Sequence, residues 1–139
     1  VGHLHHAAGQ AQVAHQLDFA LKFMPDLRIV YISALTGRGV EKIMPLVNEL
    51  YRKATFEAGT GLLNRLLAKL TDSHNPPLVG NRRLKFFYVN QTGKIPPRFR
   101  IVCNRPDDVP DNYARYLINS LKKELDLEGI PLKVDFAGR

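Results

Sequence analysis

Apolar residues recur at two different spacings along this chain, and each spacing predicts a different element. Over residues 13–24 they return every three or four positions, which predicts an amphipathic helix. Pro25 should end that helix, because proline disfavours helical geometry in the residue before it. The next segment, LRIVYIS at residues 27–33, is almost continuously apolar and rich in β-branched and aromatic side chains. Such a segment is typical of a strand covered on both faces, as in a parallel sheet.

A turn at residues 34–39 leads from this strand to a second helix, whose apolar residues begin at Val40. Pro45 falls inside the helix, where we expect it to remove a hydrogen bond and introduce a bend. Helix, strand, turn and helix form the closing unit of a doubly wound α/β domain. We therefore predict that residues 13–55 are a remnant of such a domain. Residues 1–12 are short of large apolar side chains and are predicted to be a flexible or artificially added end.

The second half of the chain changes to five shorter elements. Leucines at helical spacing predict a helix near residues 60–73, which the segment HNPPLVGN ends. Strands are expected at 84–90 and 98–103, and the first, apolar on both faces, should be the central one. A helix near 111–126 and a strand at 132–136 complete the series. This order predicts an α+β fold, a three-stranded sheet with helices on one face.

Several side chains in this half are predicted to have structural roles. Asp108 or Asp111 should cap the helix that follows, which explains these acids and Asp107 more simply than a metal cluster does. Cys103 is the only cysteine and is expected to be a buried, inert thiol in a reducing compartment. His74 should lie at a helix end. Three tyrosines could stack on bases but fall on apolar faces, where core packing is expected: Tyr88, Tyr113 and Tyr116.

Charge is concentrated in one part of the sequence. The net charge is +7, and residues 73–106 hold seven basic residues and no acidic one. A solvated charged surface is the usual explanation, whereas a polyanion-binding surface explains the absence of acids. Arg98 and Arg100 alternate with apolar residues and should share one face of their strand. The predicted RNA-binding residues are Arg82, Arg83, Lys85, Lys94, Arg98, Arg100 and Arg105.

Longer motifs resemble one family. The stretch FMPDLRIVYISALTGRGVEKIMPLV resembles the end of the second GTPase domain of the EngA (Der) family. The strings KFFYVNQTG, PPRF, PDNYARYL and GIPLKVDFAGR follow the order and spacing of that family's C-terminal KH-like domain. The resemblance covers residues from about 16 to 139. It implies that residues 56–139 form the KH-like domain and that the chain is the C-terminal part of a longer GTPase.

The resemblance also implies a function and partners. Proteins of this family assist maturation of the large ribosomal subunit in the bacterial cytoplasm, and the KH-like domain would contact ribosomal RNA. The alternative is a regulatory module that docks on the GTPase domains of its own chain. Ser33, Ala34 and Leu35 match the guanine-base loop, in which the Ala34 N–H would meet the guanine carbonyl. We expect no membrane contact, because no apolar run approaches the roughly 20 residues of a membrane span.

Departures from the family pattern limit what this chain does alone. It has no G-x-x-x-x-G-K-[ST] phosphate loop and no Asn-Lys-x-Asp guanine clamp, and no Asp-x-x-Gly magnesium loop is expected either. The chain is therefore not expected to hydrolyse GTP, and GTP and Mg²⁺ are cofactors of the intact parent only. No catalytic or metal-binding residue is predicted. A G-x-x-G clamp is also absent, which argues against readout of single-stranded bases.

Overall fold

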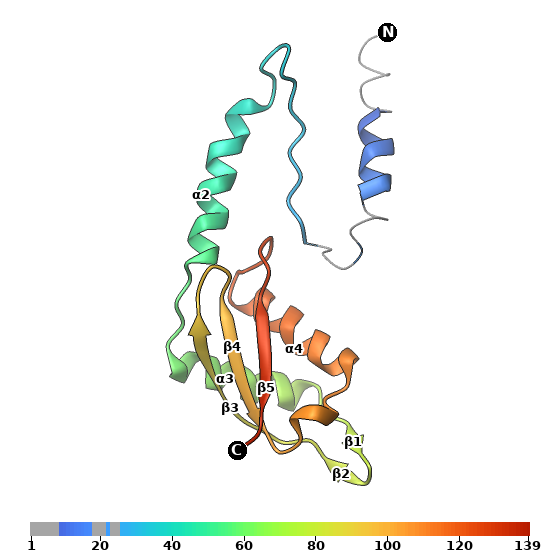
Figure 1. The fold of residues 1–139 in the computed structure, drawn as a ribbon, viewed down its shortest axis with the longest axis vertical. Coiled ribbons are helices and arrows are strands. Elements are labelled where there is room, and N and C mark those ends of the chain that lie inside the picture. Colours follow the sequence, from blue (N-terminus) through green and yellow to red (C-terminus); the bar gives the residue numbers. More distant parts are fainter. Residues whose placement is uncertain (1–8, 18–21, 23–25) are drawn as a thin grey trace. The chain divides into compact units, whose positions relative to one another are not determined.

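A computed structural model describes residues 9–17, 22 and 26–139 of the chain. They belong to two compact units, of which the second runs from Glu49 to Arg139 (Figure 1). Within the described residues, no helix combines the length and the apolar character that a membrane span requires.

The first unit contains a helix and an extended segment. Residues 9–17 are helical, so the helix already includes the four residues before its predicted start, whereas residues 18–21 and 23–25, with Pro25, lie outside the described residues. Residues 27–33 are not a strand, and that prediction was wrong. A strand exists only within a ladder of hydrogen bonds, and no described segment pairs with this one. Its apolar side chains are partly exposed as a result, including Ile32 at 53%.

The helix after the turn starts in two steps. A short 3-10 helix, η1 (Val40–Lys42), runs into the α-helix α2 (Ile43–Ala54). Pro45 is the third residue of α2, among the first four residues, whose N–H groups have no acceptor within the helix. It therefore removes no helical hydrogen bond, and Figure 1 shows α2 as one uninterrupted helix. The predicted loss of a hydrogen bond was wrong.

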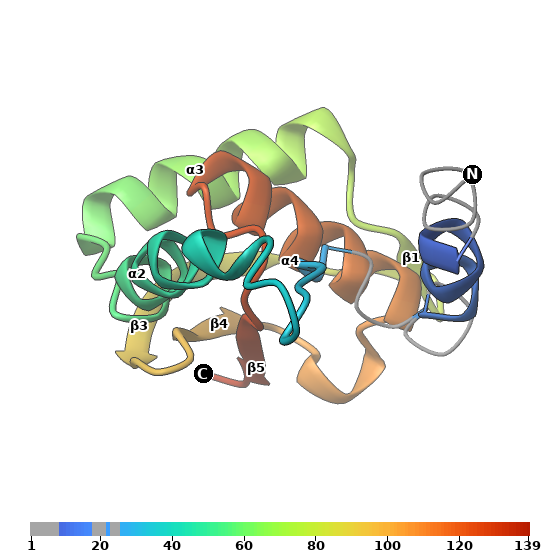
Figure 2. The same ribbon diagram turned by 90° about the horizontal axis from the view of Figure 1, so that it is seen from above.

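The second unit is a three-stranded sheet with two helices on one face, as predicted. Strands β3 and β4 are antiparallel, and β4 and β5 are parallel, in the order β3-β4-β5. Figure 2 shows α3 and α4 together on one side of the sheet. The elements are α3 (Thr60–Ser73), β1 (Leu78–Val79), β2 (Arg82–Arg83), β3 (Phe86–Gly93), β4 (Arg98–Cys103), η2 (Pro106–Asp108), α4 (Asp111–Glu124) and β5 (Lys133–Ala137).

The core lies between the sheet and these helices. Phe99 and Ile101 of β4 are completely buried, because the central strand contributes its helix-facing side to the middle of the cluster. The helices contribute leucines that recur at three- and four-residue spacing, and this spacing explains why both helices form. They are Leu63, Leu67, Leu70, Leu117 and Leu121.

The order of the strands and a bulge in β3 correct two predictions. The central strand is β4, whereas the segment predicted to be central forms the edge strand β3. A bulge between Phe86 and Tyr88 shifts the register against β4. Phe86 and Val89 therefore contribute to the core, and Tyr88 is 47% exposed on the opposite face. The prediction that Tyr88 packs in the core was wrong. Tyr113 is buried and Tyr116 packs against the core, as predicted.

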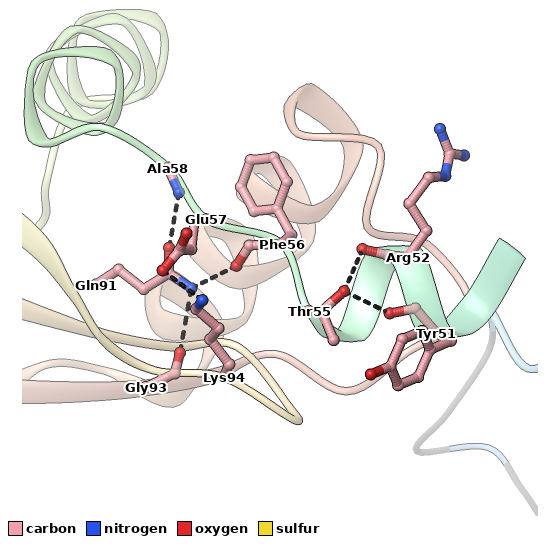
Figure 3. Close-up of polar contacts among 9 residues, drawn as sticks. All are labelled: Tyr51, Arg52, Thr55, Phe56, Glu57, Ala58, Gln91, Gly93 and Lys94. Atoms are coloured by element: carbon pink, nitrogen blue, oxygen red, sulfur yellow. Dashed lines mark hydrogen bonds and ion pairs between the residues drawn. The ribbon is translucent and has the colours of Figure 1, made fainter. Parts of the chain in front are cut away.

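Two amide side chains fasten β3 to its surroundings. The Asn64 side chain of α3 accepts a hydrogen bond from the Val89 N–H (2.9 Å) and donates one to the Val89 carbonyl (3.1 Å). The Gln91 side chain accepts from the Ala58 N–H (2.8 Å) and donates to the Phe56 carbonyl (2.7 Å), as Figure 3 shows. The Val89 backbone on the edge of β3 is thereby paired, and the linker before α3 is held against the strand.

The end of α2 is fastened by a buried charge. Lys53 is only 6% exposed. Its ammonium donates to the Glu128 carbonyl at 2.8 Å and lies 3.6 Å from Glu49 and 3.7 Å from Asp126. A buried cation requires such partners. The last turns of α2 therefore belong to the second unit, which begins seven residues before the predicted boundary at 56.

Local structure before α4 differs from expectation. The cap position of α4 is Pro110, and no side chain caps the helix, so capping by Asp108 or Asp111 was wrong. Asp108 instead pairs with the Arg105 Nε at 2.7 Å, and Asp111 lies in the first turn of α4. His74 ends α3 as predicted, and its carbonyl accepts a hydrogen bond from the Tyr113 hydroxyl.

Candidate nucleic-acid interface

The sheet face opposite the helices carries a group of exposed cations. Arg98 and Arg100 of β4 are exposed, whereas Phe99 between them is buried, so the predicted alternation is confirmed. The parallel register places Lys133 of β5 beside Arg98 and Asp135 beside Arg100. We call this surface the outer sheet face.

Sequence reasoning did not include Lys133 and Asp135 in the basic surface. The alternation of these polar residues with apolar ones within residues 132–136 was visible in the sequence, but the pairing of β5 with β4 was not. Parallel pairing depends on a crossover through α4, and no local signal reports its register. Lys133 adds a third cation to this face, and Asp135 adds one acid.

Three further predicted residues lie near the opposite end of β4. Arg82 and Arg83 are exposed in β2, and Lys85, also exposed, follows them. The Lys85 carbonyl accepts a hydrogen bond from the Asn104 N–H, just beyond β4. Because Asn104 is six residues from Arg98, the two groups are separated by about 20 Å along the strand. The structure therefore divides the predicted basic residues into two groups.

The hairpin of β1 and β2 was missed, although its signal was present. Gly80 and Asn81 connect the two strands, and both have positive φ, 52° and 60°. This combination is typical of the two-residue turn that joins twisted antiparallel strands. The string LVGNRR therefore carries the signal of a hairpin, whereas only the end of a helix was predicted there.

Two of the seven predicted residues are engaged within the protein. Lys94 forms an ion pair with Glu57 of the linker, as Figure 3 shows. Arg105 donates from Nη1 to the Val79 carbonyl (2.8 Å) and pairs through Nε with Asp108. Arg105 thus holds the hairpin against η2, and we assign it a structural role.

An aromatic patch adjoins the cations on the outer sheet face. Tyr88 lies opposite Val102, which is only 3% exposed and lies next to Ala137 of β5. The Arg139 guanidinium lies 4.1 Å from the ring centroid of Phe87, a cation–π contact. The bulge in β3 brought these rings to the surface, so the period of the sequence could not reveal them.

Ser33, Ala34 and Leu35, which match the guanine-base loop, lie in a turn. The Ser33 N–H donates to the Arg38 carbonyl (2.9 Å), the Gly37 N–H donates to the Ser33 carbonyl (2.8 Å), and Leu35 is 95% exposed. A hollow of about 370 Å³ nearby is lined by Ser33 but not by Ala34 or Leu35. The hollow therefore does not gather the three residues, and their guanine-base role stays a prediction.

Two strings in the second unit have the form of a magnesium loop, Asp-x-x-Gly, although none was expected. Residues 126–129, Asp-Leu-Glu-Gly, lie in the loop between α4 and β5, where Asp126 is near Lys53 and the Glu128 carbonyl accepts a hydrogen bond from the Lys53 ammonium. That string therefore takes part in the anchoring of α2. Residues 135–138, Asp-Phe-Ala-Gly, begin within β5, where Asp135 lies beside Arg100.

Two buried residues have raised pKa values, and neither is exposed on the outer sheet face. Burial raises the pKa of the Cys103 thiol, as expected of an inert core cysteine. Burial also raises the pKa of Tyr113 to about 12, with a smaller contribution from Tyr116. Neither shift indicates acid–base chemistry at the outer sheet face.

Comparison with known proteins identifies one family. The family described as KH-domain-like of EngA bacterial GTPase enzymes, C-terminal, matches residues 58–137. The chain is 41% identical over 130 residues to the GTPase Der of Myxococcus xanthus (strain DK1622), over 94% of this chain and 28% of that protein. The GTPase Der of Escherichia fergusonii is 41% identical over 125 residues, 90% of this chain and 26% of that protein. The chain spans about a quarter of the length of these relatives.

Proposed function

Because this chain belongs to the EngA (Der) family of GTPases, as its C-terminal region, we propose that it contacts ribosomal RNA through the outer sheet face. The family resemblance and the fold class predicted from the sequence are confirmed. The proposed contact serves assembly of the large ribosomal subunit by the bacterial parent protein in the cytoplasm. GTP and Mg²⁺ would act in the GTPase domains of that parent, and this chain alone would not turn over GTP.

One observation carries the proposal: Arg98, Arg100 and Lys133 are exposed side by side on a rigid sheet. Strand pairing and the packed helices fix the position of their backbones, so the cations present a preformed surface to phosphates. Arginine suits phosphate because its planar guanidinium donates two parallel hydrogen bonds. Such contacts position an RNA without reading its sequence.

Arg82, Arg83 and Lys85 supply a second contact beyond the other end of β4. A span of about 20 Å between the two groups suits an extended polyanion better than a single small anion. Asp135 weakens the potential around Arg100, so Arg98 and Lys133 are expected to contribute most strongly.

The salt dependence of RNA binding tests this proposal. Each phosphate neutralised contributes roughly 0.7–0.9 to the slope of log affinity against log salt. The double variant Arg98→Gln, Arg100→Gln should reduce the magnitude of the slope by about one to two units. The unfolding temperature should change little, since both side chains are exposed. Unrelated RNA sequences should lose affinity to a similar extent.

A matched control is available on the helices. Arg52 of α2 and Arg65 of α3 are exposed and lie outside the sheet. The pair Arg52→Gln, Arg65→Gln changes the net charge equally and should leave the slope nearer to that of the parent chain. If both pairs weaken binding equally, net charge alone explains the affinity. If neither changes it, the RNA surface lies elsewhere, and docking on the GTPase domains becomes the better explanation.

A further inference from the structure

The outer sheet face has a cationic end and an aromatic end. Cross-strand pairing divides the face into three rows that run across β3, β4 and β5, and the helices on the other side leave this face uncovered within the second unit (Figure 2). The rows are Arg98 with Lys133, then Asn90 with Arg100 and Asp135, then Tyr88 with Val102 and Ala137.

Tyr88 is exposed, although its neighbour in the same row is buried. It is 47% exposed, whereas Val102 beside it is 3% exposed. The neighbouring Phe87 ring is 36% exposed and carries the Arg139 guanidinium at 4.1 Å. An aromatic surface therefore lies directly beside a row that contains Arg100.

We propose that Tyr88 stacks on an unpaired base of a single-stranded RNA segment whose phosphates bind Arg100 and Arg98. This inference rests on the proposed RNA contact and specifies its substrate as single-stranded. Tyr88 and Arg100 are diagonal neighbours across β3 and β4, which places their Cα atoms roughly 7–8 Å apart, within reach of long side chains. A duplex keeps its bases stacked internally and offers none to Tyr88.

The charges on this face also indicate a path for the RNA backbone. Asp135 faces Arg100 from the β5 side and repels phosphate there, whereas Asn90 faces it from the β3 side with a neutral amide. At this row the RNA backbone should therefore pass on the β3 side of Arg100, before it reaches Arg98 and Lys133. Stacking is tolerant of base identity, so it agrees with the absence of a G-x-x-G clamp.

Binding of the full 139-residue chain to a short single-stranded RNA and to its duplex tests the inference. Tyr88→Leu should lower the affinity for the single strand about tenfold and leave the duplex affinity unchanged. Tyr88→Phe keeps the ring and should bind like the parent chain. Tyr51→Leu is the matched control, since Tyr51 is a 64% exposed tyrosine on α2. A 2-aminopurine base in the single strand should be quenched by the parent chain and less so by Tyr88→Leu.

Results that contradict the stacking inference can be told apart from results that contradict the proposed RNA contact. If Tyr88→Leu binds the single strand as tightly as the parent chain while the arginine variants remain weaker, the stacking inference fails and the proposed function stands. Equal losses for single strand and duplex would also overturn it, because a stacked base is available only in the former. If the parent chain binds neither RNA, both proposals fail together.

Discussion

Tyr113 shows how a single polar atom is accommodated in this core. Its side chain is buried, and its hydroxyl donates to the His74 carbonyl at 2.8 Å, a bond that requires the protonated phenol. Burial raises the pKa of Tyr113 from near 10 to about 12. Between these values the folded protein keeps a proton that the unfolded chain has lost, so stability should fall as pH rises from 10 to 12. The fall should approach about 1.4 kcal/mol per pH unit, measurable by urea unfolding.

The variant Tyr113→Phe separates this titration from that of the other tyrosines. It removes the ionisable group and leaves the His74 carbonyl without its donor, so it should cost about 1 kcal/mol at neutral pH. Its stability should then vary less with pH between 10 and 12 than that of the parent chain. An equally steep decline in the variant would show that another group causes the loss.

At the scale of single residues, prediction succeeded where the local period decides the environment. Arg98 and Arg100 alternate with Phe99 and Ile101, and the exposed and buried sides followed from that alternation alone. Tyr88 was misplaced because the bulge between Phe86 and Tyr88 reverses the alternation of faces along β3. The residues after the bulge therefore lie on the face opposite to the one that a regular strand would give them. Asp108 was misassigned as a cap because its partner, Arg105, lies in the preceding turn and the proline at 110 takes the cap position.

At the scale of elements, the edge strand β3 depends on a side chain from a helix. Asn64 replaces a neighbouring strand by pairing with both polar groups of the Val89 backbone. Asn64→Leu should leave both groups without partners in a largely buried position and cost about 2–3 kcal/mol. Urea unfolding gives the loss, and faster hydrogen exchange at the Val89 amide would locate it.

Asn119 provides the comparison for that substitution. It is an exposed residue of α4, and Asn119→Leu should alter stability by no more than about 0.5 kcal/mol. Comparable effects of the two substitutions would mean that leucine itself perturbs the helices. The pairing of Asn64 with β3 would then contribute little.

The helices and strands of the three-stranded sheet domain were predictable, but their arrangement was less so. The periods of residues 60–73, 98–103 and 132–136 are local properties, and each element formed near its predicted bounds. Strand order was missed because the parallel partner of β4 arrives after a helical crossover, far away in sequence. Residues 27–33 illustrate the same limit, since a strand-like composition produces a strand only beside a partner.

At the scale of the whole molecule, the second unit contains its own core. The buried cluster is formed by residues from Leu63 to Leu132, and Leu50 and Ala54 of α2 pack against it. Lys53 adds the buried contacts with Asp126 and the Glu128 carbonyl. A chain that begins at Glu49 should therefore fold cooperatively, whereas one that begins at Phe56 loses this anchor.

We expect residues 49–139 to unfold at a urea midpoint close to that of the full chain and to keep its salt slope for RNA. Residues 56–139 should be less stable by about 1–3 kcal/mol, because Leu50 and the buried ion pairs of Lys53 are absent. Their slope should be unchanged, since none of the cations on the outer sheet face is removed. Lys53→Met in the longer chain distinguishes charge from packing, because it keeps an apolar side chain in place of the ammonium. If the two shortened chains are equally stable, the last turns of α2 do not belong to the folding unit, and the boundary lies near Phe56.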